Sequence, residues 1–454
     1  MARRFLERVQ NWFSQLGGQK SGAAPDKPRI IPRDEHNISR QNISESAKKV
    51  LHRLNRSGHE AYLVGGGVRD LLLGGHPKDF DIATNATPDQ VHELFRNSRL
   101  IGRRFKLVHV LFGREVIEVT TFRGSPKDAE NDPHIDVNDQ GRLLRDNFYG
   151  TLEEDAVRRD FTVNALYYDI RDFTIHDYTG GVEDLHNRQL RLIGDPMTRY
   201  QEDPVRMLRA VRFAAKLDFT IAEDTAQPIL EMSHLLEDIP PARLFEEVLK
   251  LFTAGQGETT YRMLQRFDLF APLFPEPTKA IAEGEPDGII HCALASTDRR
   301  VSENKPITPY FLYAALLWPA LQQAWRQEEA ETEQPAYQAL QQAAGETIQN
   351  QTQATAIPRR FSTPMREIWE LQLRLGKRSG KRADKLMEHP RFRAAYDFLL
   401  VREEAGENTE GLGAWWTEYQ DADADRRREM ISALGGGGKK RSGRKRRKPR
   451  RSDS

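Results

Sequence analysis

Two aspartates one residue apart, Asp79 and Asp81, have the type and spacing needed for metal chemistry. If this run is a strand, Phe80 and Ile82 face a core and both carboxylates lie on the opposite face. Their Cα atoms are then about 6.5–7 Å apart, from a rise of about 3.3 Å per residue. Two carboxylates at this spacing can converge on one or two Mg²⁺ ions, which take oxygen ligands and often bridge to substrate phosphates. The alternative is an ordinary solvated strand face.

A triple glycine precedes these aspartates. Residues 60–64 have the pattern of a buried strand that ends at Gly65, Gly66 and Gly67, where missing Cβ atoms let backbone N–H groups approach phosphates. Residues 68–74, which include Arg69, predict a short helix whose positive dipole end faces this turn. The turn is neither a Walker loop nor a dinucleotide fingerprint, because the required glycine and lysine spacings are absent. Glycine turn, helix and aspartate strand in this order indicate a site for nucleotidyl transfer.

Glu118 is a third candidate acid for the same site. It shares one face of the predicted strand 116–120 with Thr120, while Ile117 and Val119 point the other way. Such a residue is either exposed to solvent or a third metal ligand, and as a third carboxylate it could accept the proton of an attacking hydroxyl group.

The run Arg158, Arg159 and Asp160 places two guanidinium groups beside an acid, directly before an apolar segment. Arginine forks match phosphate oxygens in a bidentate manner. Asp160 could hold a ribose hydroxyl or join the metal ligands. The alternative is a surface ion pair at a helix start.

Asp203 and Arg206 are candidates for reading a nucleotide base. Pro204 suits the first turn of a helix with Asp203 as its cap, so that Asp203 and Arg206 face one another three residues apart. An acceptor beside a donor complements the adenine edge, but cytosine presents the same order, so this pattern does not separate ATP from CTP. A helix cap with an intrahelical ion pair is the simpler alternative.

Composition limits the classes of protein that these sites could belong to. The 454 residues are 30% charged with a mean hydropathy of −0.68, and no stretch approaches the ~20 apolar residues of a membrane span. The single cysteine, Cys292, excludes an intramolecular disulfide framework and is typical of a reducing cytoplasm. Residues 1–16 carry a helical apolar stripe beside arginines; this segment could bind a membrane surface weakly, dock a partner, or be disordered, and it lacks the features of a secretory signal.

The last sixteen residues concentrate positive charge. They hold ten Lys or Arg and one acid, which gives +9, so the other 438 residues carry 1 − 9 = −8. This block follows four glycines and has no apolar residue that could join a core. Such a block is typical of an arm that binds nucleic acid, and a merely solvating tail is the alternative. The candidate RNA-binding residues are Lys439, Lys440, Arg441, Arg444, Lys445, Arg446 and Arg447.

The elements that must position these residues change in character near residue 195. Before it, strand-like runs at 62–66, 79–84, 107–112, 116–122, 165–170 and 173–179 alternate with helical ones. After it, apolar residues recur at three- and four-residue spacing as far as about residue 403, which predicts an all-helical half. Residues 322–353 are rich in Gln, Ala and Glu and predict a pair of polar helices. The fold class expected is α+β.

Five motifs resemble, in order, those of class II nucleotidyltransferases with a polymerase-beta-type head, a family that contains tRNA CCA-adding enzymes and bacterial poly(A) polymerases. They lie at residues 65–70, 79–81, 158–160, 177–185 and 202–206, and the resemblance covers roughly residues 46 to 274. Residues 102–110, 239–247 and 388–397, together with the basic tail, are more similar to the poly(A) polymerase branch.

The resemblance implies a domain order and a role for each site residue. We expect a flexible segment (1–40), a mixed α/β nucleotidyltransferase head (41–195), a helical neck that reads the base (196–275), a helical RNA-binding body (276–420) and a disordered basic tail (421–454). Asp79 and Asp81 would be metal ligands, Asp160 a further active-site acid, and Asp203 with Arg206 the base readers. The glycine turn, Arg69, Arg158 and Arg159 would contact the nucleotide.

The function implied is template-independent addition of AMP from ATP to RNA 3′ ends, with two Mg²⁺ ions, in the cytoplasm. RNA-degradation machinery and RNA chaperones are the expected protein partners, and RNA turnover the expected outcome. The nearest alternative is a tRNA CCA-adding enzyme, which would use CTP and stop after three additions. An alternative of another class is an RNA-binding or RNA-chaperone protein on a degenerate head, against which the intact aspartate pair argues.

Overall fold

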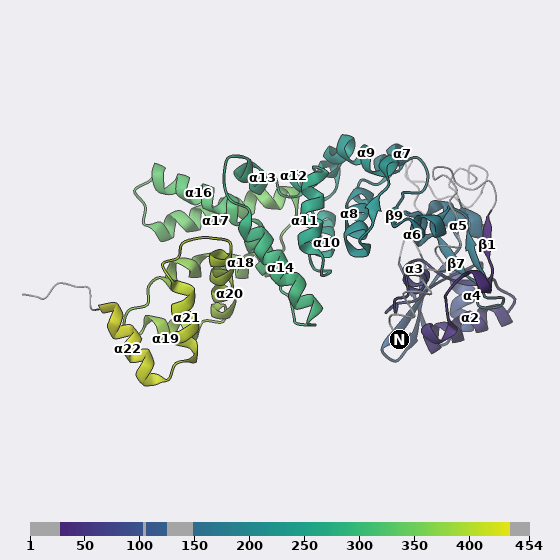
Figure 1. The fold of residues 1–454 in the computed structure, drawn as a ribbon, viewed down its shortest axis with the longest axis horizontal. Helices are drawn as coiled ribbons and strands as arrows, with labels where there is room; N and C mark the ends of the chain where they lie inside the picture. Colours follow the sequence, from purple (N-terminus) through teal and green to yellow (C-terminus); the bar gives the residue numbers. More distant parts are fainter. Residues whose placement is uncertain (1–27, 103–105, 125–148, 436–454) are drawn as a thin grey trace, which may run out of the picture. The chain divides into compact units, whose positions relative to one another are not determined.

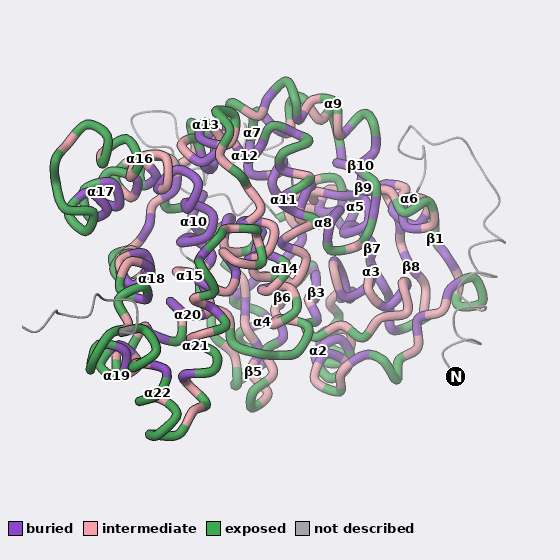
Figure 2. Tube along the Cα trace, turned by 60° about the vertical axis from the view of Figure 1, so that its left-hand side comes forward, coloured by how far each residue is buried: buried purple, intermediate pink, exposed green. Residues whose placement is uncertain are grey.

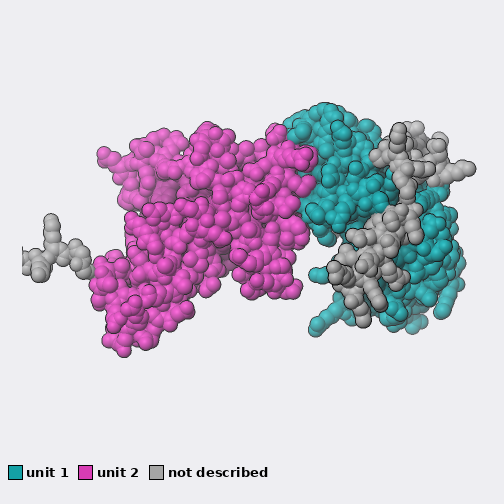
Figure 3. All heavy atoms as spheres, viewed as in Figure 1, with its two compact units in different colours: residues 1–236 teal, residues 237–454 magenta. Residues whose placement is uncertain are grey.

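The computed structural model describes residues 28–102, 106–124 and 149–435 (Figure 1). The chain divides into two compact units, residues 1–236 (unit 1) and residues 237–454 (unit 2), which Figure 3 shows in different colours. The division falls inside the range 196–275 that the sequence indicates as a neck, and the domain boundaries given above stay predictions. Among the described helices, none combines the length and apolar character needed to cross a membrane.

Unit 1 is built on an eight-stranded mixed sheet in the order β1-β8-β7-β2-β3-β6-β5-β4. Strands β3 and β6 are parallel and every other neighbouring pair in this sheet is antiparallel. The strands are β1 (Arg29–Ile31), β2 (Ala61–Val64), β3 (Asp81–Thr84), β4 (Ser98–Ile101), β5 (Leu107–Phe112), β6 (Glu115–Thr121), β7 (Leu166–Tyr168) and β8 (Ile175–Asp177). Six of them lie in the runs predicted as strands, and the α+β class is confirmed.

Eight helices accompany the strands in the described part of unit 1. They are α2 (Glu45–Arg56), α3 (Gly66–Leu72), α4 (Pro88–Leu94), α5 (Leu152–Arg158), α6 (Gly181–His186), α7 (Pro196–Glu202), α8 (Val205–Leu217) and α9 (Glu223–Met232). Helix α2 illustrates why they form: the Ser44 side chain accepts a hydrogen bond from the Ala47 N–H, and an apolar stripe that includes Val50 and Leu54 is buried. Figure 2 shows this burial along the sheet and the helices beside it.

Two sequence expectations for unit 1 need correction. Residues 28–40 are not a free segment, because β1 pairs with the edge strand β8 and the side chains of Ile31 and Ile38 are buried. The half after residue 195 is not purely helical either, because β10 (Thr220–Ile221) pairs in parallel with β9 (Gln189–Leu190). Both features are short pairings with partners distant in sequence, which local periodicity does not record.

Unit 2 is helical throughout its described residues, as predicted. Its helices are α10 (Pro241–Phe252), α11 (Gly257–Arg266), α12 (Phe270–Leu273), α13 (Pro275–Ala282), α14 (Gly288–Ser302), α15 (Pro309–Leu316), α16 (Trp318–Glu331), α17 (Ala336–Ala354), α18 (Arg359–Leu375), α19 (Arg382–Met387), α20 (Phe392–Glu404), α21 (Leu412–Asp421) and α22 (Ala424–Gly435). Helices α16 and α17 are the helix pair predicted within residues 322–353.

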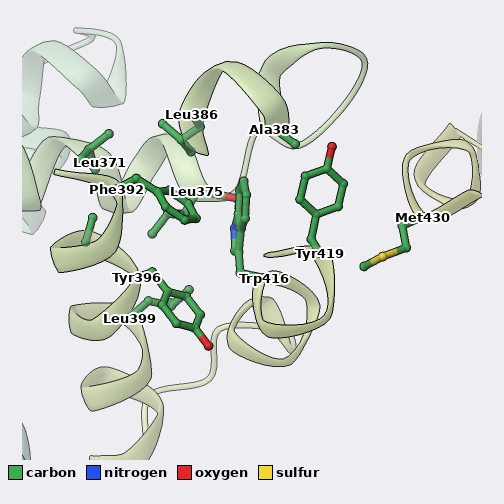
Figure 4. Close-up of a cluster of buried hydrophobic side chains, with 11 residues drawn as sticks. Leu371, Leu375, Ala383, Leu386, Phe392, Tyr396, Leu399, Trp416, Tyr419 and Met430 are labelled. Atoms are coloured by element: carbon green, nitrogen blue, oxygen red, sulfur yellow. The ribbon is translucent and has the colours of Figure 1, made fainter. Parts of the chain in front are cut away.

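Helix α22 corrects the predicted start of the tail at residue 421. Its Met430 is only 6% exposed and packs into the cluster around Trp416 and Tyr419 of α21. Figure 4 shows Met430 reaching toward Tyr419 from α22. Burial of one apolar side chain on the last helical turns therefore extends the ordered chain to Gly435, and residues 436–454 lie outside the described part.

Candidate active site

Sheet register brings Asp81 and Glu118 side by side. Strands β3 and β6 are parallel neighbours, and Asp81 is the register partner of Glu118. Because paired residues on adjacent strands lie about 4.8 Å apart and point to the same face, the two carboxylates share one face. Asp79 lies just before β3 and is exposed, while Phe80 between the two aspartates is buried at 4% exposure. Phe80 is therefore buried as predicted, but β3 begins only at Asp81, so Asp79 does not share a strand face with Asp81 as the sequence pattern predicted.

The acids form a cluster whose charges repel. The pKa of Asp81 is raised from 3.8 to about 6, first by burial and then by the negative charge of Glu118, with a smaller contribution from Asp79. The nearby Arg159 guanidinium acts in the opposite direction. Glu118 also lies 3.6 Å from His109 of β5. An acid whose pKa is raised toward neutral pH by burial and by neighbouring negative charges is typical of a functional site.

Two of these acids, Asp81 and Glu118, line a cavity of about 280 Å³, whereas Asp79 does not. Asp81, Glu118 and Thr120 come from β3 and β6. Arg123, after β6, and Arg158 and Arg159, at the end of α5, also line it. A space lined by carboxylates and by guanidinium groups suits a polyphosphate, because the arginines can bind its oxygens while the acids address a cation on it.

Arg159 is fixed within this cavity by two partners. Its Nε donates to the Tyr167 hydroxyl at 2.8 Å and its Nη2 to Asp155 Oδ2 at 3.0 Å. The Tyr167 hydroxyl donates to the same Asp155 oxygen at 2.7 Å, and Asp155 Oδ1 accepts the Arg123 backbone N–H at 3.2 Å. Burial alone would lower the pKa of Arg159, but Tyr167 and Asp155 raise it, so the guanidinium stays charged.

Sequence reasoning missed Asp155 and Arg123. Asp155 is 7% exposed and lies four residues before Arg159, a spacing that places the two side chains together on a helix. This i,i+4 acid–arginine pair was the signal available for Asp155. Arg123 follows a strand without any motif, and only the fold shows that it lines the cavity.

The glycine turn and Arg69 have separate positions. Gly65 has a φ of +73°, and a Cβ placed there would lie 3.8 Å from Arg159 Nη1 and 3.9 Å from Asp81 Oδ2, so this glycine borders the acidic site. A Cβ on Gly66 would instead meet the Arg69 guanidinium at 3.3 Å. Arg69 is 2% exposed and does not line the cavity. Its Nη1 donates to Asn164 Oδ1 at 2.6 Å, and Asp70 binds its other nitrogens.

Asp160 also lies outside the residues that line the cavity. Its Oδ1 accepts the Phe161 N–H at 2.8 Å, and its Oδ2 accepts hydrogen bonds from Arg209 of α8. Burial opposes ionisation, but Arg209 and these hydrogen bonds lower the pKa of Asp160 below its usual value. Asp160 therefore joins α8 to the end of α5 through an ion pair.

The structure starts α8 one residue later than the sequence pattern indicates. Pro204 is the N-cap of α8, while Asp203 ends α7, which Asp195 caps through the Thr198 N–H. Arg206 Nη1 donates to the Arg199 carbonyl at 2.7 Å and to Glu202 at 3.1 Å. Because Asp195 and Pro196 begin a helix of their own, Asp203 serves as the junction between two helices.

The predicted RNA-binding residues of the basic tail, from Lys439 to Arg447, lie outside the described residues, as do residues 103–105 of the motif at 102–110. The contacts of the tail with RNA stay predictions.

Solved structures share this architecture. The Thermotoga maritima CCA-adding enzyme complexed with tRNA has a TM-score of 0.58 and 18% identity, and the alignment covers 90% of this chain and 96% of that one. A CCA-adding enzyme solved with CTP has a TM-score of 0.55 and 20% identity, with 91% of each chain covered. These likenesses show that the chain has the fold of the CCA-adding enzymes.

The sequence comparisons are more specific. Three family models match: the poly A polymerase head domain at residues 61–191, a probable RNA and SrmB-binding site of polymerase A at 218–281, and the polymerase A arginine-rich C-terminus at 332–452. Poly(A) polymerase I of Salmonella typhi is 53% identical over 411 residues, which are 89% of this chain and 88% of that protein. Poly(A) polymerase I of Escherichia coli O6:H1 is 50% identical over 438 residues, or 94% of each.

A CCA-adding enzyme of Lactobacillus helveticus is 44% identical over 223 residues, which are only 49% of this chain and 52% of that enzyme. The matches that cover most of the chain are therefore to poly(A) polymerase I and not to CCA-adding enzymes. The chain belongs to the poly(A) polymerase I family.

Proposed function

We propose that this protein adds AMP from ATP to RNA 3′ ends without a template. The observation that carries the proposal is the combination of near-50% identity to poly(A) polymerase I along most of the chain with an intact acidic site. The reaction would join the RNA 3′ oxygen to the α-phosphorus of ATP, break the bond to the β-phosphate oxygen and release pyrophosphate.

Asp79 and Asp81 fit Mg²⁺ by the chemistry of their donor atoms. Asp81 carries an ionisation penalty from burial and from Glu118 and Asp79, and a bound divalent cation would relieve it. Within the described residues no group of three His, Cys, Asp or Glu side chains is arranged to hold a metal. Mg²⁺ usually takes one or two carboxylates plus substrate phosphates, and this is the arrangement we propose. When bound, such ions would neutralise charge that develops on the reacting phosphate.

The chain's own residues would bind and orient the reactants. Arg123, Arg158 and Arg159 would hold phosphate oxygens from their positions in the cavity. Glu118 lies beside Asp81 and is the acid we propose to receive the proton of the RNA 3′-hydroxyl group. Gly65 would let the nucleotide approach the backbone closely.

Base selection is proposed for Asp203 and Arg206. Among the described residues, both hydrogen bonds that hold Arg206 use Nη1, so Nη2 and Nε could address a base edge. Asp203, at the junction of α7 and α8, would accept from the exocyclic amino group of adenine.

RNA would be held by other parts of the chain. The segment from Lys439 to Arg447 would bind phosphates without reading sequence. The description of the family model at residues 218–281 supports an RNA- and protein-binding role for that range. We propose that RNA-degradation proteins and RNA chaperones are the partners and that the cytoplasm is the compartment.

The experiment is primer extension on a sequencing gel. Purified full-length protein is incubated with Mg²⁺, a 5′-labelled RNA without tRNA shape, a tRNA acceptor in parallel, and each nucleoside triphosphate separately. The variants are Asp81→Asn and Glu93→Gln, the second being an exposed acid on α4 that serves as a matched control.

A long ladder with ATP alone is expected from the wild type and from Glu93→Gln, and none from Asp81→Asn. Addition of only a few nucleotides, dependent on CTP and on the tRNA, would overturn the proposal in favour of a CCA-adding enzyme. An undiminished ladder from Asp81→Asn would remove the acidic site from the mechanism.

A further inference from the structure

Unit 2 contains a pocket of about 410 Å³ to which nothing above assigns a role. It lies where α14, α15 and α20 pack together, and the loop 303–308 forms one wall. This volume is in the usual range for small-molecule sites. Its lining combines three arginines with two aromatic rings and two acids, a mixture that an ordinary packing gap between helices does not need.

The arginines come from two helices and two of them are oriented by partners. Arg300 of α14 donates from Nε and Nη2 to the Pro306 carbonyl at 3.0 and 2.8 Å. Arg393 of α20 donates from Nε to Asp397 Oδ1 at 3.0 Å, and Arg299 is exposed. Because guanidinium groups from separate elements meet at one opening, the pocket favours an anion such as a phosphate.

The lining also provides a surface for a planar group. Tyr310 and Phe311, at the start of α15, line the pocket. Phe311 is packed edge-on against the ring of Phe398, which fixes its position. The Arg391 guanidinium lies 5.4 Å from the Tyr310 ring centroid. Aromatic rings beside arginines are the combination with which proteins stack single-stranded bases.

Asp397 and Arg393 add a hydrogen-bonding pattern. A carboxylate acceptor lies directly beside a guanidinium donor at the pocket wall. Adenine presents the complement, an amino donor at N6 next to an acceptor at N1. Uracil presents a carbonyl oxygen where adenine has its amino group, so the carboxylate would face an acceptor and the base would be rejected.

The charge of the lining selects an RNA strand over free ATP. Three arginines against Asp397 and Glu404 give a net charge of 3 − 2 = +1. One phosphodiester carries a single negative charge, whereas a free triphosphate carries several, which this lining would not neutralise. The exposed position of Arg299 also leaves one side accessible to a chain that continues in both directions.

We propose that the pocket formed by α14, α15 and α20 binds one adenylate of a poly(A) strand, with its base on Tyr310 and its phosphate on the arginines. The inference rests on the proposed function, because that activity supplies adenylates to the RNA. Unit 2 would then hold an RNA more tightly once its tail contains adenylates, without any new contact at the acidic site.

The test is equilibrium binding measured by fluorescence anisotropy. Full-length protein without nucleotide is titrated into 5′-labelled A15, C15 and U15, with AMP and ATP as competitors. The variants are Tyr310→Ala and Arg299→Ala. Arg359→Ala, which removes an equally exposed arginine at the start of α18 outside the pocket, is the matched control for loss of one charge. Thermal unfolding shows whether each variant is folded. Arg299 is exposed, so Arg299→Ala keeps the test valid if Tyr310→Ala does not fold.

Tyr310→Ala should weaken A15 binding about tenfold, the loss expected for one stacked base. Arg299→Ala should weaken A15 binding more than the control Arg359→Ala does. Neither Tyr310→Ala nor Arg299→Ala should weaken U15 binding by more than the control does. Asp397→Asn should reduce the difference in affinity between A15 and U15.

Equal losses for all three RNAs, or losses no larger than with Arg359→Ala, would overturn the inference. So would displacement of A15 by ATP at concentrations that leave the Tyr310→Ala complex unaffected, because the lining is expected to reject a free triphosphate. Displacement by AMP, which is itself an adenylate, should depend on Tyr310. The proposed function is tested separately, because Asp81→Asn should abolish extension and leave A15 binding intact. Pocket-dependent A15 binding by a protein that makes no poly(A) would refute the activity alone.

Discussion

Replacement of Asp81 by asparagine should stabilise unit 1 while it abolishes activity. Asp81 is an acid whose pKa is raised to about 6 by burial and by the charges of Glu118 and Asp79. At neutral pH the folded protein therefore holds a carboxylate whose ionisation costs more free energy than it does in the unfolded chain. Asparagine has the same shape and no charge, so it removes this cost. Functional sites commonly carry such a penalty in stability.

The magnitude follows from the size of the shift. The pKa rises from 3.8 to about 6, and at about 1.36 kcal/mol per pKa unit this corresponds to about 3 kcal/mol. For an acid with a raised folded-state pKa, the stability contributed by the bound proton is fully present below the unfolded pKa of 3.8. It is lost as the pH rises through the folded pKa of about 6. Asp81→Asn should therefore gain stability at pH 7 and none below pH ~4.

Native-state hydrogen exchange is the appropriate measurement because it reports each unit separately. Slowly exchanging amides of β2, β3 and β6 should show a higher opening free energy in Asp81→Asn at pH 7. Amides of α20 in unit 2 are the internal control and should not change. Glu93→Gln, an exposed acid on α4, should leave both sets unchanged.

An Asp81→Asn protein no more stable than the wild type at pH 7 would refute the reasoning, as would a gain that is the same at pH 4 and pH 7. Addition of Mg²⁺ with ATP provides a second check. The wild type should then gain stability because a cation relieves the same penalty, and Asp81→Asn should gain less. Equal gains would show that the cation binds elsewhere.

Three further changes test other parts of unit 1. Asp155→Asn should lower the free energy of unfolding by about 2–3 kcal/mol, because the partly buried Arg159 loses its carboxylate partner. It should also raise KM for ATP. Urea unfolding and steady-state kinetics that match the wild type would contradict these expectations. Glu118→Gln should lower activity, because the proposed proton acceptor is lost, and should move the acidic limb of the remaining pH–activity profile to lower pH, because Glu118 is the largest charge that raises the pKa of Asp81. Full activity, or an unmoved limb, would argue against these roles. Gly181→Ala should strongly destabilise unit 1, because the added Cβ would collide with the backbone carbonyl oxygen of Thr162. Melting at the wild-type temperature would show that α6 can shift.

Local patterns were sufficient for most of the fold. The central strands and the helical second half follow from periodicity, because each buries one continuous apolar face. The strand β1 and the pairing of β9 with β10 could not be predicted in the same way. Each is only two or three residues long, and its hydrogen-bonding partner is distant in sequence. Helix α22 escaped prediction because its place depends on Met430 filling a cluster formed by α21.

At the site, sequence reasoning selected only part of the cavity lining. Of the predicted residues, Asp81, Glu118, Arg158 and Arg159 line the cavity, whereas Asp79, Asp160 and Arg69 do not. Asp81 and Glu118 were predictable because strand alternation assigns faces. The position of an arginine depends on where a long side chain finds its partners, and spacing does not contain that information. Arg69 was expected at the nucleotide, yet Asn164, which is 95 residues away in sequence, binds its guanidinium in the interior. Arg123, which no motif marks, lines the cavity instead.

The run from Arg158 to Asp160 shows how one motif can serve two sides of unit 1. Arg158 and Arg159 line the acidic cavity, while Asp160 binds Arg209 on α8. Arg199 of α7 donates from Nη2 to the carbonyls of Arg158 and Arg159 at 2.9 and 3.0 Å. The helices that carry the proposed base readers are therefore attached to the two arginines that we propose bind phosphate. Because these bonds are short and partly buried, a displacement of α7 and α8 must move the arginines or break an ion pair with Asp160. The proposed base recognition and the proposed phosphate binding would therefore be mechanically linked through this motif.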